Sequence, residues 1–186
     1  MRKLKLQIQT SIDGFVCGPK GELDWMQWNW DDALKAHVTG LTQSVDCIIM
    51  GRTLASGFIP HWKQVAENAD NPEYEFGKLM DTMHKVVFSK TLDRSPWDNA
   101  ELAKGSLQNE IDKLKNQPGK DIIVYGGAGF VSSLISARLI DELNFFVNPV
   151  AISEGISIFA QKTNLNHIHS QAFDCGIILN TYQFAP

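Results

Sequence analysis

Apolar and polar residues recur along the chain with two periods, and these periods define the expected elements. Alternation over residues 4–10 predicts a strand with one apolar face. Helical spacing of Leu34, Val38 and Leu41 predicts a helix that begins near Asp32, where a carboxylate suits the positive end of the helix. Short apolar runs predict further strands at 46–50, 85–88, 100–103, 121–124 and 140–147.

Glycine, proline and serine mark the remaining boundaries. A short helix is expected to open after Gly51, followed by a polar, loop-rich region over 57–81 with a helix near 73–82. Ser106 is placed to cap a helix that ends before Pro118, and another helix is expected over 130–138. The last two apolar runs, Leu165–Phe173 and Ile177–Phe184, predict a β-hairpin.

The order of these elements predicts an α/β fold. Strands that alternate with helices favour a mainly parallel central sheet with helices on both faces, and the terminal hairpin would extend one edge as antiparallel strands. With 186 residues and no visible repeat, residues 1–186 are expected to form one domain.

Ligands of such sheets bind beyond the carboxyl ends of the strands. Four polar or glycine-rich sites follow the predicted strands, and they should converge on one edge of the sheet: Ser11 with Asp13, Gly51 with Arg52, Ser89 with Lys90, and Gly126 with Gly127. This convergence is the strongest functional signal in the sequence.

Composition and charge narrow the class of protein. A net charge of −4 without a basic run argues against a nucleic-acid partner. Eighteen consecutive apolar residues occur nowhere, so a membrane span is not expected, and the amino terminus lacks the apolar block of a signal peptide. Three unpaired cysteines fit a reducing, cytoplasmic location, and the spacing of histidines predicts no metal site.

Two strand–glycine–helix junctions can hold two phosphate-like groups, because helix amino termini favour anions. Arg52 and Lys90 add positive charge, and the hydroxyls of Thr53 and Ser89 add donors. Taken together, the two junctions, the two positive charges and the hydroxyls indicate NADPH. One such junction alone would be interpreted as a simple tight turn. A Rossmann fingerprint is absent, since Ser132 stands where its third glycine should be. No P-loop motif is present.

Several motifs, in order along nearly the whole chain, resemble the dihydrofolate reductase-like proteins related to the reductase domain of RibD in riboflavin synthesis. The motifs are Thr10–Val16, Gly21–Trp25, Ile49–Thr53, Val87–Leu92, Tyr125–Ala128, Leu139–Leu143, Pro149–Val150 and Gly155–Phe159. The resemblance implies a dihydrofolate reductase-like fold, NADPH as hydride donor, a small-molecule substrate and a homodimer.

The resemblance also implies roles for individual residues. Those expected to hold the cofactor are Ile12 beside the nicotinamide, Gly51, Arg52 and Thr53 at the phosphates, Ser89 and Lys90 near the 2′-phosphate, and Ala128, Gly129, Phe130 and Val131 over the pyrophosphate. Gly126 and Gly127 would form a strained turn with an unusual peptide bond. Gln7, Gln9 and Trp25 would face the substrate, and Asp13, Asp32 or water would supply the proton.

The activity itself stays open at this level. Folate-reducing enzymes are mostly apolar where Gln7 and Gln9 stand, and Ser153 replaces a glycine that the family usually shows. A pyrimidine reductase of the riboflavin type, a dihydrofolate reductase and a non-catalytic module that binds a nucleotide or flavin all remain alternatives.

Overall fold

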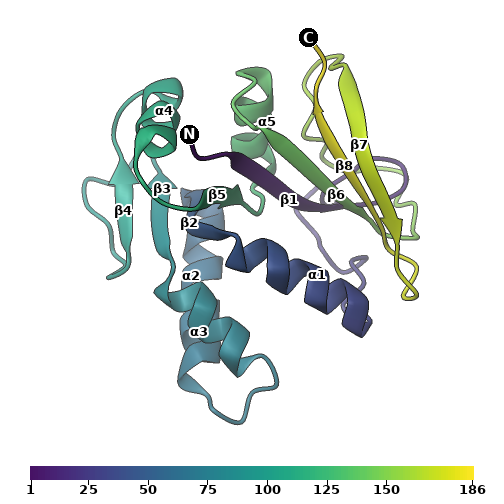
Figure 1. Ribbon diagram of the computed structural model, residues 1–186, viewed down its shortest axis with the longest axis horizontal. Coiled ribbons are helices and arrows are strands. Elements are labelled where there is room, and N and C mark those ends of the chain that lie inside the picture. The colour runs from purple at the N-terminus through teal and green to yellow at the C-terminus, as the bar shows by residue number, and fades with distance from the viewer.

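The computed structural model describes residues 1–186, and an eight-stranded sheet forms its centre (Figure 1). The strands are β1 (Leu4–Thr10), β2 (Val45–Gly51), β3 (His84–Phe88), β4 (Ala100–Ala103), β5 (Asp121–Val124), β6 (Glu142–Val147), β7 (Leu165–Ala172) and β8 (Ile178–Phe184). Their order across the sheet is β4-β3-β2-β5-β1-β6-β8-β7. The first six are parallel, and β8 and β7 continue the sheet as antiparallel strands, which confirms the predicted α/β fold.

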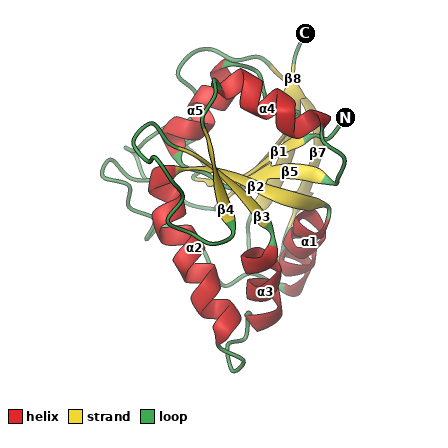
Figure 2. Cartoon of the chain, turned by 90° about the vertical axis from the view of Figure 1, so that its left-hand side faces the viewer, coloured by secondary structure: helices red, strands yellow, loops and turns green.

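Helices cover both faces of the sheet (Figure 2). They are α1 (Asp32–Gln43), α2 (Arg52–Glu67), α3 (Tyr74–Thr82), α4 (Leu107–Asn116) and α5 (Ala128–Ser136). Helices α4 and α5 pack on one face, where the apolar side of β1 joins the largest core cluster. The other face carries α2 and α3 over β2 and β3, and α1 over β6 and β8. None of the helices is long and apolar enough to cross a membrane.

On the face covered by α1, α2 and α3, which we call the second face, strand β1 lies between two apolar clusters. One cluster lies under α2 and α3, and the other lies under α1. Its burial alternates strictly, with Leu4, Leu6 and Ile8 buried toward α4 and α5. The intervening residues Lys5, Gln7 and Gln9 therefore point to the face that carries α1 and α2. A polar strip thus runs along the middle of an otherwise apolar sheet face.

The predicted loop-rich region after Gly57 is wrong in its first half, because α2 continues to Glu67. Pro60 lies inside this helix and removes one backbone donor, which normally opposes a helix interior. Burial of Ile59 in the core and of Val65 against Gly77 of α3 outweighs that loss. The helix predicted near 73–82 is confirmed as α3.

The predicted helix starts are supported by their caps. The carboxylate of Asp31 accepts the N–H of Leu34 at the start of α1, and the Ser106 hydroxyl accepts that of Asn109 at the start of α4. The fifth helix begins at Ala128, two residues before the predicted start.

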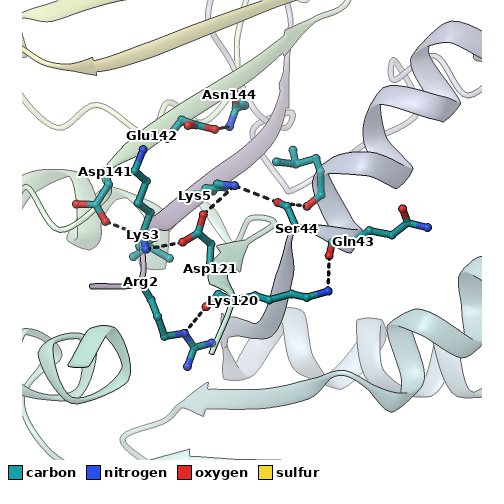
Figure 3. A network of polar contacts seen from close by, with 12 residues as sticks. Arg2, Lys3, Lys5, Gln43, Ser44, Lys120, Asp121, Asp141, Glu142 and Asn144 are labelled. Carbon is teal, nitrogen blue, oxygen red and sulfur yellow. Dashed lines mark hydrogen bonds and ion pairs between the residues drawn. The ribbon is translucent and has the colours of Figure 1, made fainter. Parts of the chain in front are cut away.

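A polar network fastens the amino ends of β1 and β5 to their neighbours (Figure 3). Asp121 accepts the backbone N–H of Lys3 at 2.8 Å and pairs with the Lys5 ammonium at 3.0 Å. The Lys5 side chain is 12% exposed and also donates to the Ser44 hydroxyl. We call Asp121, Lys5, Ser44 and the Lys3 backbone the basal network, because it lies at the end of the sheet opposite to the carboxyl ends of β1 and β5.

Lys85 is a buried charge on β3. Its ammonium donates to the carbonyls of Asp81 at 2.8 Å and Met83 at 2.7 Å, and its side chain is inaccessible to solvent. Burial lowers the pKa of Lys85 to about 8, although nearby Asp81 opposes that shift. The amide of Asn99 donates to the same two carbonyls, so they would keep a partner without the lysine.

We expect the Lys85 ammonium to make stability rise with pH between about 8 and 10.5. In this window the unfolded chain holds a proton that the folded chain has released, so deprotonation favours folding by up to about 3 kcal/mol. Urea titrations from pH 7 to 10.5 should show this rise in wild type and Lys104→Met, an exposed lysine, and not in Lys85→Met. A parallel slope in Lys85→Met would assign the rise to other groups.

Candidate functional site

The carboxyl ends of β1, β2, β3 and β5 lie together at one end of the sheet, which we call the rim. Register pairs place Gly51 of β2 beside Phe88 of β3, and Ile49 of β2 beside Val124 of β5. The segments that follow these strands therefore start side by side. They carry the polar and glycine-rich candidates identified in the sequence.

Two helices at the rim begin without a side-chain cap. Helix α2 follows Gly51 and α5 follows Gly127, and neither has a capping hydrogen bond or an acidic residue in its first turn. By contrast, α1 and α4 are capped and carry an acid in the first turn. The starts of α2 and α5 thus keep free N–H groups and an uncompensated positive end, which favour an anion.

Phe130 joins the two uncapped helix starts. A Cβ placed on Gly51 would lie 3.3 Å from the Cβ of Phe130, and one placed on Gly127 would lie 3.8 Å from the same atom. The rings of Phe130 and Phe88 pack at 4.9 Å between centroids. The ends of β2, β3 and β5 therefore meet at a single aromatic contact, and a side chain larger than glycine at position 51 would crowd it.

The turn before α5 has a left-handed backbone. Gly126 has φ +151° and Gly127 has φ +82°, which L-residues adopt at a cost. The predicted unusual peptide bond is not found, since the chain has no cis peptide bond. Glycine adopts these φ values readily, so the turn is tight without strain in its two glycines. The N–H of Val131 is already bonded to the Gly127 carbonyl, so the free donors belong to Ala128, Gly129 and Phe130.

Positive charge at the rim has no partner within the protein. The side chains of Arg52 and Lys90 are exposed and form neither an ion pair nor a hydrogen bond, and Thr53 next to Arg52 is also free. The Ser89 hydroxyl is instead used inside its loop, where it accepts the N–H groups of Thr91 and Leu92. A hollow of about 610 Å³ lies on the adjoining loop, residues 91–96.

The two candidate acids lie in different settings. Asp13 follows β1 and accepts the backbone N–H groups of Ile152 at 3.3 Å and Ser153 at 2.8 Å. Hydrogen bonding from the Ser11 side chain, and then from these amides, lowers the pKa of Asp13. Asp32 has a fully exposed side chain on the outside of α1, and Lys35 at 3.9 Å is its ion-pair partner.

Three candidate substrate residues line the second face of the sheet or the loop above it. Gln7 carries a buried Oε1 without a hydrogen-bond partner, and Trp25 carries a buried Nε1 in the same condition. Gln9 accepts a hydrogen bond from Asn148 at 2.9 Å. Ile12 follows β1 and is 64% exposed at the rim. Orphaned polar atoms in a folded protein call for a partner from outside, which a ligand or water can supply.

Sequence reasoning missed Asn148 and Gln27. The wholly buried Asn148 bonds to Gln9 of β1, and its Oδ1 accepts the N–H of Gln27 in the tryptophan-bearing loop. Gln27 in turn donates to the carbonyl of Cys175 in the terminal hairpin. The strand predicted over 140–147 ends just before Asn148, but nothing in the pattern of the sequence showed which distant segments this residue joins.

The model of the RibD C-terminal domain family matches residues 2–179. The chain belongs to this family. It is 31% identical over 189 residues to the uncharacterized protein YyaP of Bacillus subtilis, covering 98% of this chain and 95% of YyaP. The family is one of reductases, and the resemblance found in the sequence is confirmed.

Solved structures agree on the fold of this RibD C-terminal domain protein. A putative riboflavin biosynthesis protein from Shewanella superposes with a TM-score of 0.71 at 23% identity, covering 100% of both chains. Dihydrofolate reductase from Enterococcus faecalis, solved with NADP(H), gives a TM-score of 0.62 at 12% identity, covering 99% of this chain and 97% of that one. These likenesses establish a dihydrofolate reductase-like fold.

Proposed function

We propose that the protein is an NADPH-dependent reductase of the RibD C-terminal type, similar to 5-amino-6-(5-phosphoribosylamino)uracil reductase, acting on a small heterocyclic, carbonyl or imine substrate. The observation that carries this proposal is the pair of uncapped helix starts that meet at Phe130, within a chain of a reductase family. The E. faecalis structural relative holds NADP(H), which supports the choice of cofactor.

The rim fits a nucleotide with several negative charges. The free N–H groups of Ala128, Gly129 and Phe130 would bind the pyrophosphate from above Gly126 and Gly127. Arg52 with Thr53 would hold the phosphates at the start of α2, while the Lys90 ammonium would neutralise the 2′-phosphate and the Ser89 hydroxyl would donate a hydrogen bond to it. Val131 contributes through its packing in the core and not through its N–H.

When bound, NADPH supplies the hydride, and the protein supplies orientation. Ile12 offers an exposed apolar surface at the end of β1, against which the nicotinamide would lie. Gln7, Gln9 and the loop with Trp25 would bind the substrate on the second sheet face. The two rings would thus meet over β1 with water excluded.

Water is the proposed proton source in preference to Asp13 and Asp32. Asp13 is held as a carboxylate by the hydrogen bonds that lower its pKa, so it is a poor acid near neutral pH. Its geometry suits a positioning role, because it ties the end of β1 to residues 152–153. Asp32 points to solvent from the outer side of α1.

A fluorescence titration with NADPH tests the cofactor assignment. We expect wild type to bind at micromolar concentration and Arg52→Ala to bind about tenfold more weakly, because one charge-assisted contact to phosphate is lost. Lys162→Ala is the matched control, since it removes one exposed positive charge beside the amino end of β7.

Two outcomes would contradict the proposal. Absence of NADPH binding by wild type at millimolar concentration would remove the cofactor assignment. Binding without any NADPH consumption across pyrimidine, pterin and quinone substrates would favour a non-catalytic nucleotide-binding module. An equal loss in Lys162→Ala would show that overall charge, and not Arg52 at the rim, determines affinity.

A further inference from the structure

The turn formed by Gly126 and Gly127, which we call the diglycine turn, is held by few backbone contacts. No backbone–backbone hydrogen bond involves Tyr125 or Gly126, and Gly127 takes part in one only, in which its carbonyl accepts the N–H of Val131. A Cβ placed on Gly126 would meet no atom within 4 Å, and glycine has little conformational preference of its own. The position of the turn therefore depends on its neighbours along the chain, which are Tyr125 before it and α5 after it.

The Tyr125 side chain is fixed on the second face of the sheet. Its ring stacks on that of Phe58 in α2, with 5.6 Å between the ring centroids and 26° between the ring planes. Its hydroxyl oxygen lies 3.2 Å from that of Thr42 in α1 and 3.9 Å from the sulfur of Met80 in α3. A single residue thus contacts all three helices that cover this face, immediately before the diglycine turn.

The direction of these hydrogen bonds follows from the burial of Thr42. This residue is inaccessible to solvent, and the Tyr125 hydroxyl is the only hydrogen-bond partner of its side chain. If Tyr125 donated to Thr42, the Thr42 proton would be buried without an acceptor, which is unfavourable. Thr42 therefore donates to Tyr125, and Tyr125 donates to the Met80 sulfur, which can only accept. Burial also raises the pKa of Tyr125 to about 12, so the phenol keeps its proton at neutral pH.

The stacking on Phe58 connects Tyr125 to the second uncapped helix start. Phe58 belongs to α2, which begins at Arg52 without a capping hydrogen bond. The diglycine turn also approaches this helix directly, since a Cβ placed on Gly127 would lie 3.9 Å from the Cβ of Leu54. The two helix starts proposed to bind the cofactor phosphates are therefore linked through the segment that Tyr125 begins.

We propose that Tyr125 is a positioning residue for the cofactor, and that the hydrogen bond from Thr42 to its hydroxyl holds the diglycine turn in place relative to α1 and α2. This inference rests on the proposed function and deepens it, because both residues would act on the pyrophosphate site through the turn. Without the bond, the turn would occupy a wider range of positions. The free N–H groups at the start of α5 would then have to be ordered at the moment of binding, which costs affinity.

Tyr125→Phe tests the effect on the turn without any ligand, because it removes the hydroxyl and keeps the ring. The Val131 amide is the reporter, since its acceptor is the Gly127 carbonyl. Amide exchange measured by NMR should become at least about fivefold faster at Val131 than in wild type, relative to Ile135 one turn further along α5. A general loss of stability would accelerate the two amides alike.

The same variant should raise the NADPH dissociation constant about fivefold in a fluorescence titration, as expected for the loss of one hydrogen bond. Tyr182→Phe is the matched control. It removes a phenol hydroxyl from β8, where the ring packs against Phe145 on the opposite face of the sheet. This control should change neither the exchange ratio nor the affinity.

Thr42→Val separates positioning from stability. Tyr125→Phe alone leaves the Thr42 hydroxyl buried without an acceptor, which should lower the urea midpoint by about 1 M. In the Thr42→Val/Tyr125→Phe double variant, apolar groups of the same shape replace both partners, so the midpoint should recover. The bond between α1 and the turn is still absent, so fast Val131 exchange and weakened NADPH binding should persist. A merely structural role requires stability and affinity to recover together.

The outcomes distinguish the inference from the proposed function. An unchanged exchange ratio in Tyr125→Phe, or an NADPH affinity that recovers with stability in the double variant, overturns the positioning role and leaves the cofactor assignment standing. Faster Val131 exchange with wild-type NADPH affinity overturns the link between the turn and the cofactor. Absence of NADPH binding by wild type, with faster Val131 exchange in Tyr125→Phe, would reject the proposed function, while the turn would still depend on Tyr125.

Discussion

Gly127→Val is expected to weaken NADPH binding at least about 100-fold while the protein remains folded. Gly127 has φ +82°, a backbone region that costs an L-residue about 1–2 kcal/mol and is especially unfavourable for a β-branched one. The new side chain would also grow toward Phe130 and Leu54, which lie 3.8 and 3.9 Å from its Cβ position. Relief of this strain would turn the N–H groups of α5 away from the pyrophosphate. NADPH fluorescence titration measures the loss.

Gly40→Ala is the matched control for that substitution. Gly40 lies inside α1 with open space around its Cβ position, so alanine should keep NADPH affinity and stabilise the helix by up to about 1 kcal/mol. Circular dichroism would confirm that Gly127→Val retains the helices and sheet. Unchanged NADPH affinity in a folded Gly127→Val protein would show that the turn before α5 is not a phosphate site.

The fold could be predicted from hydrophobic periodicity and from the residues that end helices and strands, wherever the local sequence pattern and the burial of the residues agree. The strict alternation in β1 and the serine before α4 both predicted structure correctly, because each is decided within a few residues. The second half of α2 was missed for the opposite reason. Pro60 and its polar neighbours favour a loop locally, whereas burial of Ile59 in the core and of Val65 against Gly77 of α3 favours a helix.

The location of the candidate site could be predicted from the sequence, but the contacts between its residues could not. Carboxyl ends of parallel strands meet at one edge, so the neighbourhood of Gly51 and Gly127 followed from strand order. Their meeting at Phe130 depends on side-chain packing across two helices, which no local pattern encodes. Asn148 was missed for a related reason, since its partners Gln9 and Gln27 lie 139 and 121 residues away in the sequence.

The candidate acids show why residue type alone cannot assign a proton donor. Asp13 and Asp32 are both carboxylates near the predicted site, but one accepts two backbone N–H groups and the other faces solvent. The side of α1 that faces the sheet presents Leu34 and Val38 instead of an acid. The rotation of the helix about its axis decides this, and residue type does not reveal it.

Asp121→Ala is expected to destabilise the protein by about 2–4 kcal/mol, because it breaks the basal network of Figure 3. Removing the carboxylate leaves the Lys5 ammonium, 12% exposed, with only the Ser44 hydroxyl as partner. It also frees the backbone N–H of Lys3. The loss lies below that of a fully buried pair, because the Asp121 side chain is 28% exposed. Urea denaturation at pH 7 measures it.

The effect of Asp121 should also depend on pH in a defined direction. Burial opposes its ionisation, but the N–H of Lys3 and the ammonium of Lys5 outweigh burial and lower the pKa of Asp121. Its contribution is therefore complete above about pH 4 and is lost as the pH falls through the folded value. Asp98→Ala, which removes an exposed carboxylate 3.8 Å from Lys63, should change stability by less than about 0.5 kcal/mol. Equal losses in the two variants would mean that the basal network contributes no more than a surface ion pair.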